Sequence, residues 1–216
     1  MNAKLDQALN RLKRILPLEA RQHACSGQIR ALHQRILRSF VDRGRILTRE
    51  EMAQHVSDPE HAISVLKSSD LVVFSGDGDP VGAYPFTMEM REYEVRVNRH
   101  RVHAMCALDA LAISPMFGMK TQIESRCRLS GGRVAIQQAG TAIENPDEAG
   151  DVRFGIDWGA ARAGASCANS LCMEMIFLQD GQVAREWLKG DAGTKQAFTL
   201  PEAVEFARRF FVPLMA

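Results

Sequence analysis

Residues 105–115 read MCALDALAISP, an apolar stretch that carries one thiol and one carboxylate. Its alanines and leucines favour a helix. Residues three apart lie on the same face of a helix, so Cys106 and Asp109 are expected to point into the same small volume. A carboxylate on an apolar face costs free energy unless it is paired or used in chemistry. The pair is therefore the first candidate for a functional site.

Each residue of the pair also has an ordinary interpretation. A free cysteine is more often a small buried hydrophobe than a nucleophile, and a buried aspartate can be satisfied by the backbone or by an arginine. Two features favour a function for Cys106: backbone N–H groups near the start of a helix stabilise a thiolate, and basic residues lie just upstream. Partial burial would raise the pKa of Asp109, so that it holds a proton near neutrality.

Bulk composition narrows the class of protein. The chain has 216 residues, 46% of them hydrophobic, and a net charge of +1, so it can form one or two domains around a real core. Balanced charge argues against nucleic acid or an anionic membrane as partner. The N-terminal segment has an amphipathic pattern in place of a signal-peptide core, which favours a soluble, cytoplasmic protein with five reduced cysteines.

Residues 1–88 are expected to form a helical, winged-helix-like region. Helices are predicted over 5–16 and from 28 to a stop at Gly44, followed by a capping box at Thr48 and a further helix capped by Asp58. Two short strands near 71–75 and 83–88 complete the winged-helix order. The second short helix, PEHAISVLKSS, has one lysine and no arginine, so DNA reading is not expected.

Residues 89–216 are expected to form an α+β domain with a mixed or antiparallel sheet and flanking helices. The pattern predicts a helix over 103–113 that Pro115 stops, and a hairpin over 121–138 with its turn at 130–132. Strands are predicted at 92–97, 151–158 and 172–178, and helices at 182–188 and 200–211.

Three other thiols bear on the site. Cys172 is expected to open the strand 172–178, and Cys167 lies five residues upstream in a loop of small residues. With Cys106 they could bind a soft metal, although the spacing does not match a zinc ribbon. Cys127 is expected in mid-strand with a structural role. Methionines such as Met175 are interpreted as core fillers, and no dinucleotide, phosphate-loop or serine-hydrolase motif is present.

The stretch AMCALDALAISPMFGMKTQIESRC, residues 104–127, resembles the alkylmercury lyases (organomercurial lyases). That family has a similar Cys-Ala-Leu-Asp helix, then an apolar stretch with a proline and a strand with a further cysteine. The segments ILTREEMAQHV to YPFTMEMREYEVRV and CMEMIFLQDGQVAREW also look like the family. The likeness covers roughly residues 45–190. The chain departs from the family's pattern in its long 150–171 segment and in Glu174.

The resemblance implies that Cys106 and Cys172 bind the mercury of an organomercurial substrate as thiolates. Asp109 would take a thiol proton and deliver it to the carbon, giving a hydrocarbon and Hg(II). No cofactor is implied, and the metal would pass to cellular thiols or a mercuric reductase. Cys167 competes with Cys172 for the role of second thiol.

Two other functions stay open from the sequence. One is a non-catalytic, thiol-based sensor or carrier of soft metals on the same scaffold, and the other is a winged-helix regulator. Asp109 separates the first of these from an enzyme, because a pure metal binder needs no proton donor beside its thiol.

Overall fold

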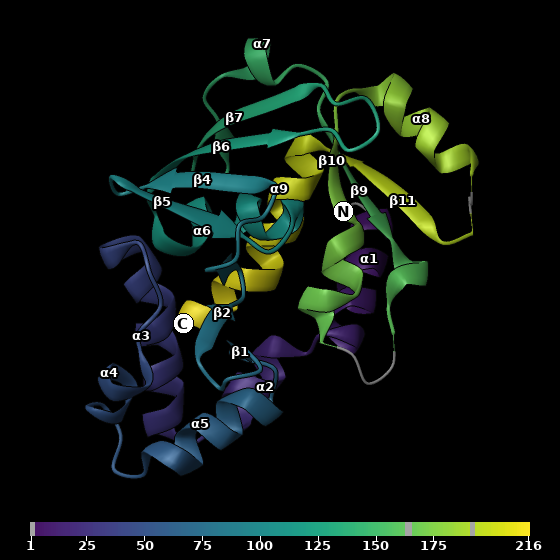
Figure 1. Cartoon of the computed structure of the whole chain (residues 1–216). Helices are drawn as coiled ribbons and strands as arrows, with labels where there is room; N and C mark the ends of the chain where they lie inside the picture. Colours follow the sequence, from purple (N-terminus) through teal and green to yellow (C-terminus); the bar gives the residue numbers. More distant parts are fainter. Residues whose placement is uncertain (1–2, 163–165, 191–192) are drawn as a thin grey trace.

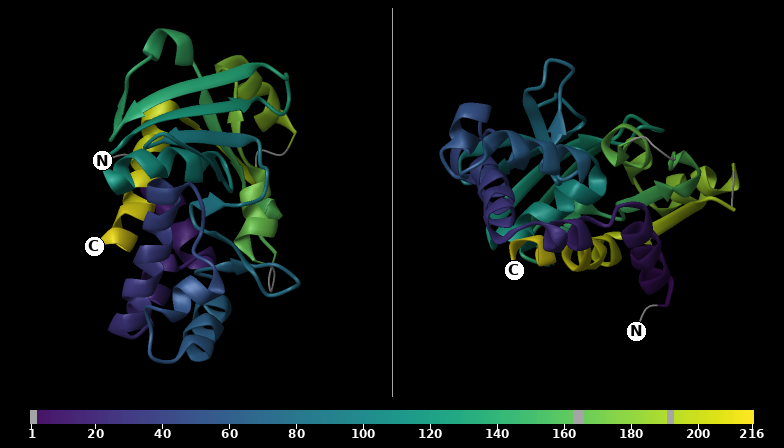
Figure 2. Two further views of the ribbon diagram at one scale, coloured as in Figure 1. Left: turned by 60° about the vertical axis from the view of Figure 1, so that its left-hand side comes forward. Right: turned by 90° about the horizontal axis from the view of Figure 1, so that it is seen from below.

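The computed structural model describes residues 3–162, 166–190 and 193–216. Its N-terminal part is helical, as predicted: α1 (Ala3–Ile15), α2 (Leu18–Ala24), α3 (Gly27–Arg43), α4 (Arg49–Ala53) and α5 (Pro59–Ser68). Helices α3 to α5 lie at the opposite end of the molecule from the short helix α7 (Pro146–Ala149) (Figures 1 and 2).

The predicted helix ends are confirmed at three positions. Gly44 follows α3 in the left-handed conformation, at φ 71°, which glycine adopts without steric cost. Thr48 Oγ1 accepts from the backbone N–H of Glu51, whose carboxylate accepts from Thr48 N in return. Asp58 Oδ1 accepts from the N–H of His61 at 3.0 Å. Local sequence therefore fixes where these helices begin and end.

Two antiparallel sheets form the rest of the frame. The larger has the strand order β1-β2-β3-β5-β4-β6-β7-β8; its strands are β1 (Val73–Phe74), β2 (Pro80–Ala83), β3 (Phe86–Thr87), β4 (Tyr93–Val97), β5 (His100–Ala104), β6 (Lys120–Arg126), β7 (Arg133–Ala139) and β8 (Ala142–Ile143). The smaller has the order β10-β9-β11, from β9 (Arg153–Asp157), β10 (Met175–Leu178) and β11 (Lys195–Thr199).

Helices and short 3-10 turns surround the smaller sheet. The described residues between β9 and β10 form three 3-10 turns: η1 (Trp158–Ala160), η2 (Cys167–Asn169) and η3 (Leu171–Glu174). The chain then runs through α8 (Gly181–Lys189), β11 and α9 (Leu200–Phe211) to a last turn, η4 (Val212–Met215). The predicted α+β class, with antiparallel sheets and flanking helices, is confirmed.

Helix α6 (Ala107–Phe117) lies at the centre of the molecule. It packs against α9 on one side and against strands β4 to β7 and β10 on the other (Figure 1). Nine of its eleven residues are buried, Asp109 among them. An apolar helix without a polar face belongs inside a protein, so the stretch quoted first forms the middle of the fold.

The predicted bounds of this helix are wrong at both ends. Residues 103–104 belong to β5, and α6 begins only after Cys106. Pro115 does not stop α6, which continues to Phe117 and ends at Gly118, at φ 64°. Proline cannot donate to the carbonyl four residues earlier, but the side chain of Gln138 on β7 donates to Leu111 O at 3.0 Å in its place. A neighbouring strand thus satisfies the carbonyl that the proline leaves free.

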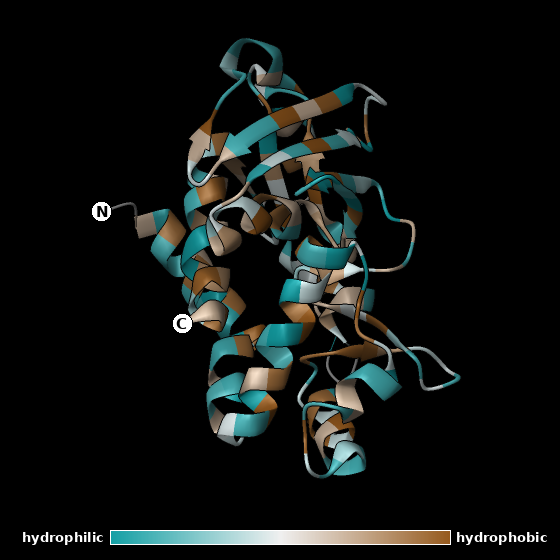
Figure 3. Ribbon diagram, turned by 90° about the vertical axis from the view of Figure 1, so that its left-hand side faces the viewer, coloured by the Kyte–Doolittle hydropathy of each residue, from teal (hydrophilic) through white to brown (hydrophobic). Residues whose placement is uncertain are grey.

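The main hydrophobic core runs from Leu5 on α1 to Leu214 on η4, and a smaller cluster joins α8 to β10 through Ile176, Leu178, Ala184 and Trp187. Apolar and polar residues alternate along its helices and strands (Figure 3), as expected where one face is buried. The division into 1–88 and 89–216 stays a prediction, as does the winged-helix likeness; β3 and β5 pair across that division. Among the described residues, no helix combines the length and apolar character needed to cross a bilayer.

Candidate active site

Cys106 is the N-cap of α6. Its backbone is extended, at φ −153°, and its Sγ accepts from the backbone N–H of Asp109 at 3.4 Å. A serine, threonine or aspartate side chain usually takes this place. The sulfur therefore lies at the positive end of the helix dipole, where a thiolate is stabilised.

Asp109 lies on the same face of α6, as the spacing predicted. The residue is only 1% exposed, and its Oδ2 has no hydrogen-bond partner within the described part of the chain. A buried carboxyl oxygen without a partner is costly for the fold. Such a group is a candidate for chemistry because nothing in the packing requires it.

Cys172 comes to the pair from far along the sequence. It lies in η3, one short turn before β10, so the expectation that it opens the strand is wrong. Because β10 packs against α6, the turn brings this sulfur to the N-terminus of the helix. The ligand atoms of Cys106, Asp109 and Cys172 all lie within 4.8 Å of one another, and all three residues are buried.

Burial dominates the electrostatics of the cluster. It raises the pKa of Asp109 to about 7, although contacts with Cys106 lower it in part. Burial likewise raises the pKa of the Cys106 thiol to about 12. Its two thiol neighbours, Cys106 and Cys167, raise the pKa of Cys172 well above the ordinary value. The two thiols therefore hold their protons at neutral pH, and the carboxyl group of Asp109 is near the midpoint of its titration.

The contact of Met175 and Tyr84 with the cluster was not predicted from the sequence, whereas Cys167 was a candidate and lies there. The Sδ of Met175, interpreted as a core filler, lies 3.7 Å from Cys106 Sγ. Cys167 Sγ lies 3.4 Å from Cys172 Sγ, and Tyr84 contacts the turn that carries Cys167. Cys127 lies outside the cluster, in the turn after β6 and not in mid-strand. No local signal marks Met175 or Tyr84, because only the tertiary fold brings them here.

Glu174 does not face the cluster. Its carboxylate pairs with Arg128 at 3.4 Å, and its side chain is 42% exposed. The same arginine donates to Met173 O at 2.6 Å. The unusual Met-Glu-Met sequence therefore places Glu174 outward, while Met175 contacts the sulfur of Cys106.

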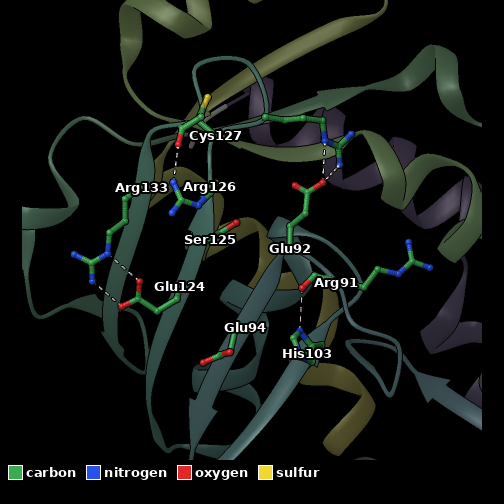
Figure 4. A pocket seen from close by; sticks show the side chains of 11 residues that line it. Arg91, Glu92, Glu94, His103, Glu124, Ser125, Arg126, Cys127 and Arg133 are labelled. Atoms are coloured by element: carbon green, nitrogen blue, oxygen red, sulfur yellow. Dashed lines mark hydrogen bonds and ion pairs between the residues drawn. The ribbon is translucent and has the colours of Figure 1, made fainter.

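A cavity of about 610 Å³ lies elsewhere, on the outer face of the larger sheet (Figure 4). Arginines and glutamates line it, and they pair with one another, as Arg133 does with Glu124 at 2.8 Å and Arg128 with Glu92 at 3.1 Å. None of the three clustered residues lines this cavity. Most charges of this cavity are therefore matched, and Arg126 donates to Gly131 O at 3.2 Å.

Comparisons with known proteins indicate the family of this chain. A family model described as alkylmercury lyase matches residues 86–212. Alkylmercury lyases of Bacillus cereus and Clostridium butyricum are each 25% identical over 178 residues, which is 76% of this chain and 74% of the relative. A solved structure, "Crystal structure of the mercury-bound form of MerB2", is 18% identical, with a TM-score of 0.75 over 95% of this chain and 98% of that one. At that identity the structural match supports the fold alone.

Proposed function

The chain belongs to the alkylmercury lyase family, and from this premise we propose that it cleaves the carbon–mercury bond of organomercurials with Cys106, Asp109 and Cys172. One observation carries the proposal: two thiols and a carboxyl group, whose Oδ2 has no hydrogen-bond partner among the described residues, converge within 4.8 Å in the core. Mercury(II) is a soft ion that prefers thiolate ligands. A proton donor beside two such ligands is what a protonolysis requires.

The proposed reaction balances in three steps. Cys106 binds R–Hg⁺ and loses its thiol proton to the ligand that it displaces from mercury. Asp109 then takes the proton of Cys172, whose thiolate becomes the second ligand. Finally, Asp109 gives this proton to the carbon, the Hg–C bond breaks, and R–H leaves while Hg(II) stays on both sulfurs. Two thiolate donors make the carbon basic enough to accept the proton.

The pKa values support these roles. A carboxyl group with a pKa of about 7 can both accept and release a proton near neutral pH. The thiols have raised pKa values and are protonated until the metal arrives, and metal binding displaces their protons. The apolar surroundings suit an alkyl or aryl group and exclude water.

The product needs an acceptor, and we propose small cellular thiols or a mercuric reductase in the cytoplasm. The five cysteines are unpaired, which fits a reducing compartment. Exchange between thiols would then move Hg(II) away from the site.

Asp109→Asn tests the proposal most directly. The wild type, given phenylmercury and excess thiol, should release benzene, measured by gas chromatography. The variant should still bind Hg(II) through both thiols but release no benzene, because the amide has no proton of comparable acidity to give. Wild-type binding of Hg(II) without any benzene would instead favour the non-catalytic metal binder.

A further inference from the structure

We propose that Cys167 is a third mercury ligand, which takes over the product ion from Cys106 so that Cys172 and Cys167 hold it before release. The inference rests on the proposed function, because the ion is the product of that reaction. It concerns a residue that carbon–mercury cleavage itself does not use.

The distance between the two sulfurs is the first observation. Cys167 Sγ lies 3.4 Å from Cys172 Sγ. A metal–thiolate bond of about 2.3 Å is a suitable scale. Two such bonds end to end are longer than the distance between the sulfurs of Cys167 and Cys172. An ion bonded to Cys172 can therefore also bond to Cys167 after a small shift of the two side chains. Soft thiolates are the donors that mercury prefers.

The second observation is that distant residues fix the turn that carries Cys167. The Oη of Tyr84 accepts from the N–H of Ala168 at 2.9 Å and donates to Asp70 Oδ2 at 3.3 Å. Arg21 lies 3.8 Å from the same carboxylate. Backbone contacts from the N-terminal part of the chain therefore hold this thiol against Cys172.

The handover balances without an added reactant. Cys167 as a thiol attacks the mercury of Cys106–S–Hg–S–Cys172 and forms a three-sulfur intermediate. The Hg–S bond to Cys106 then breaks, and the proton displaced from Cys167 ends on Cys106. The products are Cys172–S–Hg–S–Cys167 and a free Cys106 thiol.

The test uses Hg(II) alone as the probe, under anaerobic reducing conditions that prevent disulfides. Cys106→Ser should retain the ion against a competing dithiol, because Cys172 and Cys167 remain. Relative to Cys106→Ser, the affinity of Cys106→Ser/Cys167→Ser for Hg(II) should fall by more than roughly 10–100-fold. A change of that size is what the loss of a residue that only supports a metal ligand costs. Cys106→Ser/Cys127→Ser is the matched control and should bind like Cys106→Ser.

X-ray absorption spectroscopy gives a second readout and a check on folding. Mercury should have two sulfur ligands in Cys106→Ser and one in the Cys106→Ser/Cys167→Ser variant, with circular dichroism unchanged. Equal affinity and equal sulfur counts in these two variants would overturn the role of Cys167 and leave the proposed function standing. A different result would be Hg(II) binding that depends on Cys167 in a wild type that releases no benzene. That result would refute the proposed cleavage, and with it the transfer of the product ion to Cys167.

Discussion

At the scale of single residues, the buried carboxyl group of Asp109 destabilises the fold but is available for proton transfer. Burial raises the pKa of its carboxyl group to about 7, against 3.8 in a model peptide. An acid whose pKa is raised on folding loses stability as pH rises from its unfolded value to its folded one, because the unfolded state releases the proton first. The cost reaches about 4 kcal/mol at 1.36 kcal/mol per pKa unit.

Asp109→Asn should therefore stabilise the fold while it abolishes cleavage. The gain in free energy of unfolding should be small near pH 4 and increase towards pH 7, up to about 4 kcal/mol. Urea unfolding at several pH values measures it. If the variant is less stable than the wild type at pH 7, the carboxylate has hydrogen-bond partners in the folded chain and its burial does not lower the free energy of unfolding.

Two cysteines offer a matched comparison. Cys106→Ser should abolish benzene release, because serine is a poor ligand for soft mercury. Cys127→Ser should retain turnover and lose about 1 kcal/mol of stability, since this buried thiol lies outside the cluster. Benzene release and thermal unfolding, measured on both variants, check the pair. Turnover in the Cys106 variant would overturn its assignment.

How far the sequence predicts the site depends on where the residues lie along the chain. Cys106 and Asp109 are three apart on one helix, so helical geometry alone predicts their common face. Cys172 is 66 positions beyond Cys106; thiol chemistry made it one of two candidates for a soft-metal site with Cys106, and the family resemblance chose it over Cys167. Met175 and Tyr84 carry no motif, and their places follow from the packing of β10 and of the loop before β3.

At the scale of elements, α6 depends on a side chain from a strand. Gln138 donates from its Nε2 to Leu111 O and to Gly140 O, and it is fully buried. Gln138→Ala should therefore lose about 1–3 kcal/mol, because the carbonyl that Pro115 cannot satisfy is left unpaired. Gln137→Ala, on the exposed face of the same strand, is the control and should change stability little. Denaturant midpoints compare the two, and equal midpoints would contradict the role of Gln138.

The elements that the sequence predicted well have strong local signals. The capping box at Thr48 and the glycine after α3 are examples, because a few neighbouring residues determine them. β5 and β11 were missed because HRVHA and KQAFT are polar and become strands only by pairing with β4 and β9. Tertiary context likewise keeps α6 helical through its proline, which local rules treat as a stop.

At the scale of the whole molecule, the two ends of the chain are joined. Arg209 on α9 pairs with Asp6 on α1 at 2.7 Å. The buried side chain of Gln22 on α2 donates both to His33 Nδ1 at 2.8 Å and to Leu214 O at 3.0 Å. Contacts across nearly 200 residues leave no periodic signal in the sequence, so the packing of the N-terminal helices against α9 and η4 could not be predicted from it.

At the junction of the N-terminal helices with η4, where Gln22 contacts both His33 and Leu214, His33 should change stability with pH in the opposite direction to Asp109. Burial lowers the pKa of His33 to about 4, from 6.5 in a model peptide. Stability is then lost as pH falls from 6.5 to 4, because the unfolded state binds the proton first, at a cost of about 3 kcal/mol. Asp109 acts in the opposite direction over nearly the same range, so the two contributions largely cancel in the wild type.

Each substitution removes one of the two opposing contributions, so the stability of the variant should change with pH as the remaining group dictates. Relative to the wild type, His33→Gln should gain stability as pH falls from 6.5 to 4, whereas Asp109→Asn should lose its advantage over the same interval. His55→Gln, at an exposed histidine, is the control and should follow the wild-type curve. Urea unfolding across this range measures the differences. Parallel curves for His33→Gln and the wild type would mean that His33 takes up its proton equally in the folded and unfolded chains, and that the junction contributes nothing to the pH response.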